Sequence, residues 1–247
     1  GIIANELSNA SGWNGTVQNL TIKDSSLAVS LKEGASGNAF VGGVTGQYDR
    51  GHINGITLEN VGIALVGNPG GEIAVGGAVG KAQWAGPKGH ISVYGVTTDK
   101  NCSVFVDAGE STNARAGGIV GRKGSSDQLF INNCVNNATV YSTHTAAGII
   151  GACYERDDNR IENCKNYGNI YGKEIAASVM AVCDSGNAVV KNIVAGGFIS
   201  GENEVHNAFR TEVSKENVKV VSIKVDATEE GDVLAYYQTR AADEGKV

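Results

Sequence analysis

The stretch INNCVNNATVYS at residues 131–142 returns thirty residues later as IENCKNYGNIYG at 161–172. A glycine-rich phrase precedes each copy, AGGIVG at 116–121 and AAGIIG at 146–151. The apolar runs are short, rich in β-branched residues and bounded by Gly and Asn, which is typical of strands rather than helices. A thirty-residue period with several strands per unit predicts an all-β fold, a single parallel β-solenoid with one coil per unit.

About seven units appear when the chain is aligned on this period, and the alignment gives columns of apolar residues. The first column reads Leu20, Val61, Val96, Cys134, Cys164, Ile193 and Ile223. The second reads Val17, Leu58, Val93, Ile131, Ile161, Val190 and Val220. The third reads Val44, Ala78, Ile119, Ile149, Val179 and Phe209. We expect these columns to point into one core, with successive coils about 4.8 Å apart.

A column of asparagines accompanies the apolar ones. It contains Asn19, Asn60, Asn133, Asn163 and Asn192, with Gly95 and Ser222 as exceptions. Stacked Asn residues at a turn can pass amide hydrogen bonds between coils and tolerate left-handed backbone, although Asn is also a common turn residue. The glycine phrase is interpreted as scaffold, where Gly117 and Gly121 leave room for close approach or supply unusual backbone angles. It is not a phosphate-binding loop, because no GxxxxGK[ST] or helix-opening GxGxxG is present.

The expected domain organisation is one solenoid between two end segments. The repeat spans residues 17–225, residues 1–16 form a lead-in or N-terminal cap, and residues 226–247 form a C-terminal cap or tail. The chain opens with Gly1 and shows no signal peptide, so we expect it to be a segment of a longer precursor.

Composition excludes several classes of protein. Gly is 35 of 247 residues but Pro only 2, without a G-X-Y period, which excludes collagen. The net charge of −6 argues against nucleic acid as a partner, because phosphate binding needs clustered Lys and Arg. No apolar run is long enough for a transmembrane segment.

The repeat motifs, GGIVG followed by INNC.N.A.V and AGIIG followed by IENC.N.G.I.G, resemble the GLUG-type and related Gly-rich β-helix repeats of bacterial surface proteins, including adhesin-like ones. The resemblance covers residues 38–201 best. It implies a right-handed parallel β-helix and a secreted or cell-surface location. It carries over no catalytic residues, because the family motif is structural.

Three aromatic residues are candidates for ligand binding. Tyr48, Trp84 and Tyr154 follow the glycine phrase in different coils, so their loops are expected along one edge of the solenoid. Exposed rings offer flat apolar faces to sugars or partner side chains. The alternative is that each ring packs back onto its own loop.

Charged residues in the loops around 122–160 form a second candidate site, of the kind a polysaccharide lyase or glycoside hydrolase requires. These residues are Arg122, Asp127, Glu155, Asp157, Asp158 and Arg160. A solvated charged turn is the simpler interpretation. No metal site or cofactor is predicted, although the repeated GHI sequences could stack His52 on His90.

The five cysteines do not form a zinc motif or a dense disulfide framework. Cys134 and Cys164 are expected as buried stacked thiols. Cys153 and Cys183 lie thirty residues apart, so either a disulfide or free thiols is possible, with stacking geometry favouring free thiols.

Three functions remain open from sequence. The first is a non-catalytic, adhesin-like binding module at the cell surface, with a glycan or a host surface protein as partner. The alternatives are a polysaccharide-cleaving enzyme using the 122–160 loops, and a structural spacer.

Overall fold

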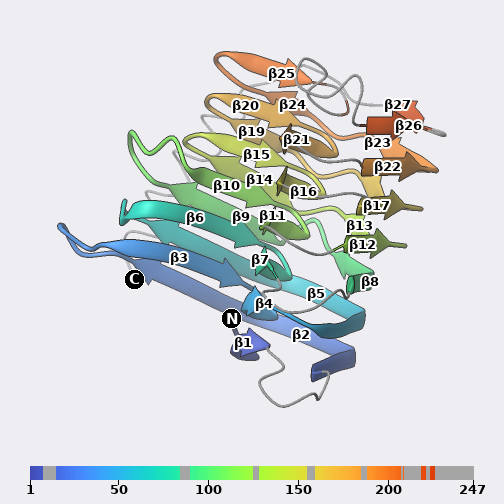
Figure 1. The fold of residues 1–247 in the computed structure, drawn as a ribbon, viewed down its shortest axis with the longest axis horizontal. Coiled ribbons are helices and arrows are strands. Elements are labelled where there is room, and N and C mark those ends of the chain that lie inside the picture. The colour runs from blue at the N-terminus through green and yellow to red at the C-terminus, as the bar shows by residue number, and fades with distance from the viewer. Residues whose placement is uncertain are drawn as a thin grey trace.

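The computed structural model describes residues 1–7, 15–83, 90–124, 128–154, 159–184, 188–206, 208, 218–220 and 223–225. These residues contain strands and no helix, and the strands form three sheets in which every pairing is parallel. The chain passes repeatedly through sheet A, sheet B and sheet C in that order. Figure 1 shows the resulting layers, which together form a parallel β-solenoid. No described helix is long and apolar enough to cross a membrane.

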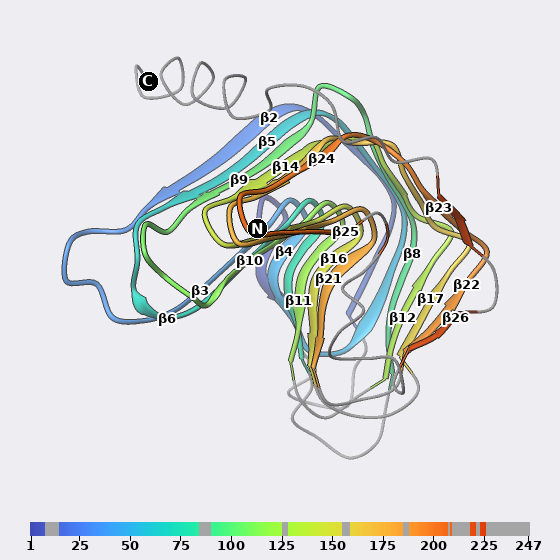
Figure 2. The ribbon, with the colours of Figure 1, turned by 90° about the horizontal axis from the view of Figure 1, so that it is seen from above.

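Sheet A and sheet C each contain one short strand per coil. Sheet A consists of β1 (Ala4–Leu7), β4 (Thr45–Tyr48), β7 (Val79–Ala82), β11 (Val120–Lys123), β16 (Ile150–Tyr154) and β21 (Met180–Asp184). Sheet C consists of β3 (Gly37–Gly42), β6 (Gly70–Gly76), β10 (Ala114–Gly117), β15 (Thr145–Ala147), β20 (Ile175–Ala177) and β25 (Glu204–His206). Viewed almost end-on, sheet A lies between sheet C and one part of sheet B (Figure 2).

Sheet B is the largest sheet and changes character along the solenoid. Each of the first two coils contributes one strand of 16 residues to this sheet, β2 (Gly15–Ser30) and β5 (Gly51–Val66). Later coils divide the same path at corners. The later strands are β8 (His90–Thr98), β9 (Ser103–Asp107), β12 (Gln128–Asn132), β13 (Val135–Asn136), β14 (Thr139–Ser142), β17 (Asn159–Glu162), β18 (Lys165–Asn166), β19 (Ile170–Gly172), β22 (Ala188–Lys191), β23 (Ile193–Ala195), β24 (Ile199–Ser200), β26 (Val218–Val220) and β27 (Ile223–Val225).

The expected thirty-residue register is confirmed in the later coils. Ile131 pairs with Ile161, Ile161 with Val190, and Val190 with Val220. Cys134, Cys164 and Ile193 are all buried, as the first column predicts. In the third column, backbone hydrogen bonds connect Val44, Ala78, Ile119, Ile149 and Val179 in series and then reach Ala208. Phe209, the last expected member, lies outside the described residues.

The expected register is wrong in the second coil by five residues. Ile56 pairs with Leu20 and Val96, and Ile53 with Val17 and Val93, where Val61 and Leu58 were expected. The physical reason is a second corner within the long strands. Asp24 and Asn60 both have positive φ, and Asn60 Nδ2 donates to Asp24 Oδ1 at 2.8 Å. Asn60 therefore lies at this second corner and is not a member of the asparagine column, although it has the same residue type and the same backbone conformation.

The true corner column consists of residues with left-handed backbone. Its members are Asn19 (φ 52°), Gly55 (63°), Gly95 (61°), Asn133 (54°), Asn163 (54°) and Asn192 (53°). Asn and Gly share this column because both adopt positive φ at low cost. Amide bonds between coils also occur, since Asn192 Nδ2 donates to Asn163 Oδ1 at 2.7 Å and Asn163 Nδ2 donates to Asn132 Oδ1 at 3.1 Å.

The glycine phrase lies where sheets C and A meet. A Cβ at Gly117 would lie 1.9 Å from Val120 O, and one at Gly121 would lie 2.6 Å from Val75 N. Neither glycine has positive φ, so these residues are needed for space rather than for backbone angle. The interpretation as scaffold at a close approach is confirmed.

The N-terminal end of the solenoid differs from the expected division. β1 pairs with β4, so residues 4–7 already belong to the first coil rather than to a separate lead-in. The expected C-terminal cap at 226–247 lies outside the described residues.

Candidate functional site

The outward faces of sheets C and A form a concave corner, which we call the A–C corner. It is lined from sheet C by Phe40, Glu72, Arg115 and the nearby His144, and from sheet A by Gln47, Lys81, Arg122 and Tyr154. Gln47, Lys81 and Arg122 occupy one register position on three consecutive strands. The N-terminal end of the corner holds a cavity of about 260 Å³ lined by Asn5, Glu6, Asn38, Phe40 and Gln47.

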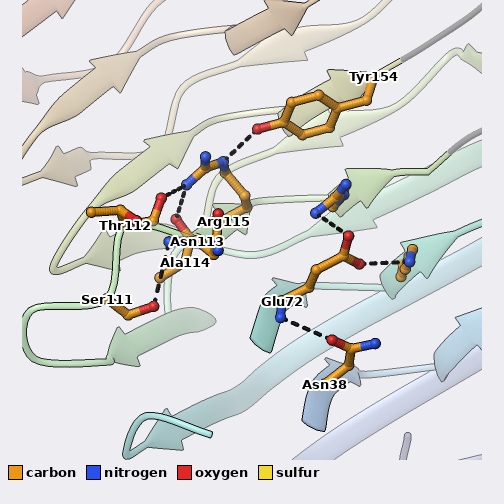
Figure 3. A network of polar contacts seen from close by, with 10 residues as sticks. Asn38, Glu72, Ser111, Thr112, Asn113, Ala114, Arg115 and Tyr154 are labelled. Carbon is orange, nitrogen blue, oxygen red and sulfur yellow. Dashed lines mark hydrogen bonds and ion pairs between the residues drawn. The ribbon is translucent and has the colours of Figure 1, made fainter. Parts of the chain in front are cut away.

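Glu72 connects the two walls of this corner. Its Oε2 pairs with Lys81 Nζ at 2.7 Å and its Oε1 with Arg122 NH1 at 2.9 Å. Figure 3 shows the Glu72 carboxylate with its two dashed contacts to nitrogen atoms, together with the bond from Glu72 N to Asn38 Oδ1, which is 2.9 Å long. The Lys81 ammonium also lies 4.7 Å from the centre of the Phe40 ring. One carboxylate thus serves two cations that are mostly shielded from solvent.

The next two coils add a guanidinium from Arg115, and then a phenol from Tyr154 and an imidazole from His144. Arg115 Nε donates to Tyr154 Oη at 2.9 Å, and Arg115 NH1 donates to the carbonyls of Thr112 and Ala114 (Figure 3). Arg115 NH1 also lies 3.2 Å from His144 Nδ1. Burial and the Arg115 charge lower the pKa of His144 to about 4, against a smaller opposing effect of Glu174. His144 is therefore neutral at pH 7, and its Nδ1 lies 2.7 Å from Thr145 Oγ1 as well as 3.2 Å from Arg115 NH1.

The three predicted aromatic residues do not form an exposed edge in the described structure. The expectation is wrong for Tyr48, which is fully buried because alternation along β4 turns its side chain into the core. Its hydroxyl donates to Ser92 O at 3.3 Å. Tyr154 lies in the A–C corner, where Arg122 covers its ring at 4.4 Å from the ring centre. Trp84 lies outside the described residues.

The predicted charged cluster is not brought together by its described members. Arg122 projects from sheet A into the A–C corner, whereas Arg160 projects from sheet B and lies 5.5 Å from the centre of the Phe130 ring. Strand alternation and the change of sheet separate the two guanidiniums, although their loops are close in the repeat. Asp127, Glu155, Asp157 and Asp158 lie outside the described residues.

A second candidate surface lies on the outer face of sheet B. A depression of about 210 Å³ is lined by Ser92, Tyr94, Phe130, Ile131, Asn132, Arg160 and Glu162. These residues come from the neighbouring strands β8, β12 and β17. Tyr94 is 44% exposed, which makes it one of the most exposed large apolar side chains described. The depression thus combines aromatic rings with amide, carboxylate and guanidinium groups.

The cysteines and histidines show no catalytic or metal-binding geometry in the described part of the chain. All five cysteines are free and buried, so Cys153 and Cys183, which pair in register, are stacked thiols. Burial and the neighbouring Cys183 raise the pKa of Cys153 to about 12, against a smaller opposing effect of Lys123. His52 lies opposite Ser92 rather than His90, so the expected histidine stack is wrong. The described residues contain no cluster of three or more potential metal ligands.

No protein family, no curated protein and no solved structure matches this chain.

Only weak sequence signals mark the residues of these candidate sites that were not predicted. Lys81 directly follows the last glycine of VGGAVG, and Arg122 directly follows the last glycine of AGGIVG. The two residues therefore share one position in the repeat, and they pair in the structure. Arg115 precedes AGGIVG directly. Glu72 and His144 have no counterpart of the same residue type in the neighbouring coils, so only their contacts in the folded chain identify them. Tyr94 occurs in the degenerate unit VYGVTT, where no motif marks it.

Proposed function

We propose that this protein is a non-catalytic, adhesin-like binding module that holds a glycan against the outer face of sheet B. The observation that carries the proposal is the depression beside Tyr94, where an exposed ring adjoins Asn132, Arg160 and Glu162. An aromatic ring offers a flat apolar face to a sugar, while amide, guanidinium and carboxylate groups match sugar hydroxyls with donors and acceptors. The strands beneath are held in register on both sides, so these groups need little ordering on binding.

The described groups of the A–C corner that could act as a catalytic acid or base are engaged with one another, which favours a non-catalytic function. The carboxylate, Glu72, is held by two cations, and the imidazole is neutral and bonded to Arg115. A glycosidase needs two carboxyl groups flanking the scissile bond, and among the described residues no second carboxylate pairs with the cations that hold Glu72. The secreted, cell-surface setting is part of the same proposal and comes from the resemblance of the repeats to those of GLUG-type surface proteins.

The test is a glycan array followed by calorimetric titration of the best ligand with the wild type and with Tyr94→Ala. Loss of a stacked ring is expected to weaken binding by about 1–3 kcal/mol. Tyr167→Ala is the matched control, because Tyr167 is 48% exposed but lies outside the depression. Equal affinity of Tyr94→Ala and the wild type would contradict the proposed surface.

The same ligand separates the remaining functions. Incubation with the wild type followed by assays for new reducing ends and unsaturated products is expected to show none. Turnover would support a polysaccharide-cleaving enzyme instead. An array without any ligand would support a structural spacer.

A further inference from the structure

The A–C corner holds more positive than negative charge at its centre. Lys81, Arg115 and Arg122 converge there, and among the described residues the only carboxylate paired with them is Glu72. Arg115 is only 9% exposed. Its described hydrogen-bonding partners are a phenol, two backbone carbonyls and a neutral imidazole, none of which carries a negative charge. Asp49 interacts electrostatically with Lys81, but its hydrogen bond at 2.9 Å is accepted from Gln47 Nε2. A buried cation without a counter-ion is costly, so this arrangement favours an added anion.

A second observation points to the same place. Arg122 Nε is a buried nitrogen that lacks a hydrogen-bond partner within the described structure, although NH1 of the same group is bonded to Glu72. A buried donor left without an acceptor in a native structure calls for an explanation such as a bound water or ion. The guanidiniums of Arg122 and Arg115 both contact Tyr154, one over its ring and the other at its hydroxyl.

We propose that Arg115 and Arg122 form an oxyanion site beside Tyr154, which takes a carboxylate or a sulfate group. Guanidinium groups suit this ligand because their planar donors match the oxygens of carboxylate and sulfate. Such groups occur as free ions and on acidic glycans. The site lies on sheets A and C rather than on the outer face of sheet B, so it does not depend on the proposed glycan surface.

The first experiment measures thermal unfolding in millimolar sodium sulfate against sodium chloride of equal ionic strength. Sulfate at ten times its dissociation constant is expected to raise the melting temperature by roughly 3–6 °C for a chain of this size. Arg122→Gln is expected to remove most of this increment. Lys165→Gln is the matched control, since it removes one positive charge from an exposed position on sheet B, and it should keep the full increment.

A general salt effect would raise the melting temperatures of the wild type and of Arg122→Gln equally, and that result would overturn the proposal. A second experiment avoids variants. Crystals of the wild type grown with selenate should show anomalous selenium density between Arg115 and Arg122, and its absence at saturating selenate would also overturn the site.

The source of the anion is then resolved by titration with a uronate oligosaccharide, a sulfated oligosaccharide and inorganic sulfate. Tighter binding of either oligosaccharide, lost in Arg122→Gln but not in Lys165→Gln, assigns the site to an acidic glycan. Binding of inorganic sulfate alone, with the same dependence on Arg122, assigns it to a free anion.

Discussion

Two asparagine positions three residues apart have opposite roles in this solenoid. Asn133, Asn163 and Asn192 are exposed at the corner and adopt positive φ. Asn136 and Asn166 are fully buried and have ordinary backbone angles. Asn136 Nδ2 donates to Asn166 Oδ1 at 2.8 Å, and Asn166 Nδ2 donates to Gly196 O at 2.8 Å. The corner therefore uses the backbone tolerance of Asn, and the interior uses its amide.

The buried amides also explain the second glycine of the repeated phrase. A Cβ at Gly118 would lie 2.4 Å from Asn136 Cγ, and one at Gly148 would lie 2.3 Å from Asn166 Cγ. In the next coil Ser178 replaces glycine, and its hydroxyl accepts from Asn166 Nδ2 at 3.0 Å. The glycine and the buried asparagine are thus one structural unit. The comparison shows that one residue type can be selected for backbone angle at one position and for hydrogen bonding at another.

The largest effect is expected from Asn166→Asp. The change places a carboxylate against Gly168 O, Gly196 O and Ser178 Oγ, and the two carbonyls can only accept hydrogen bonds. An unpaired buried charge should cost about 3–5 kcal/mol of unfolding free energy. Chemical denaturation at pH 8 and pH 5 provides the measurement, and the loss should be smaller at pH 5, where more of the buried carboxyl is protonated. A loss below that of Asn163→Asp would show that the interior position is no more demanding than the corner.

Removing one side chain from the buried pair is expected to cost less. Asn136→Ala deprives Thr98 Oγ1 and Asn166 Oδ1 of a partner, and each lies in the interior. Leaving buried polar groups unsatisfied should lower the unfolding free energy by about 2–3 kcal/mol. A double-mutant cycle with Thr98→Val measures how much of this loss is coupling between the two side chains. Zero coupling would mean that the hydrogen bond of 2.9 Å between them contributes nothing.

A smaller effect is expected at the exposed corner. Asn163→Ala forces a residue with a Cβ to keep φ near 54°, which should cost about 1–2 kcal/mol. Asn163→Gly relieves this strain and should cost less than Asn163→Ala. Melting curves of the two variants compare them directly, and equal losses would show that the amide bond from Asn192, rather than the backbone angle, is what matters.

The smallest effect is expected where glycine already occupies the corner. Gly95→Asn introduces a residue that tolerates φ near 61°, and its Cβ would lie 3.4 Å from Gly55 N. The change should stay within about 0.5–1 kcal/mol, because the lower entropy of the unfolded chain offsets a tight contact. Gly117→Ala is the opposing control, since its Cβ meets Val120 O at 1.9 Å, and equal effects of the two substitutions would contradict the distinction between angle and space.

The repeat predicted the later coils well because each thirty-residue unit must place the same side chains inward. Cys134, Cys164 and Ile193 were found from spacing alone, and all three are buried. The second coil was misaligned because Asn60 offered the same residue type as the corner column. Gly55 occupies the corner position in this coil, and only the pairing of β5 with β2 and β8 identifies that position.

The candidate sites were less predictable for a similar reason. Arg122 and Tyr154 lie in the A–C corner, but the sequence grouped Arg122 with Arg160, which belongs to another sheet. Tyr48 was expected outside, and its position in an alternating strand placed it inside. Loop neighbours in the repeat are not neighbours in space when successive residues point to opposite faces.

The sequence by itself determined the parallel solenoid, its period, its inward columns and the scaffold role of the glycine phrase. These follow from repetition, because residues at equal spacing stack in equal environments. Only the tertiary structure decided that sheet C folds onto sheet A, bringing Glu72, Lys81, Arg115, Arg122 and Tyr154 into one corner. That corner is a contact between outward faces of different sheets, and a one-dimensional period carries no information about which outward faces meet.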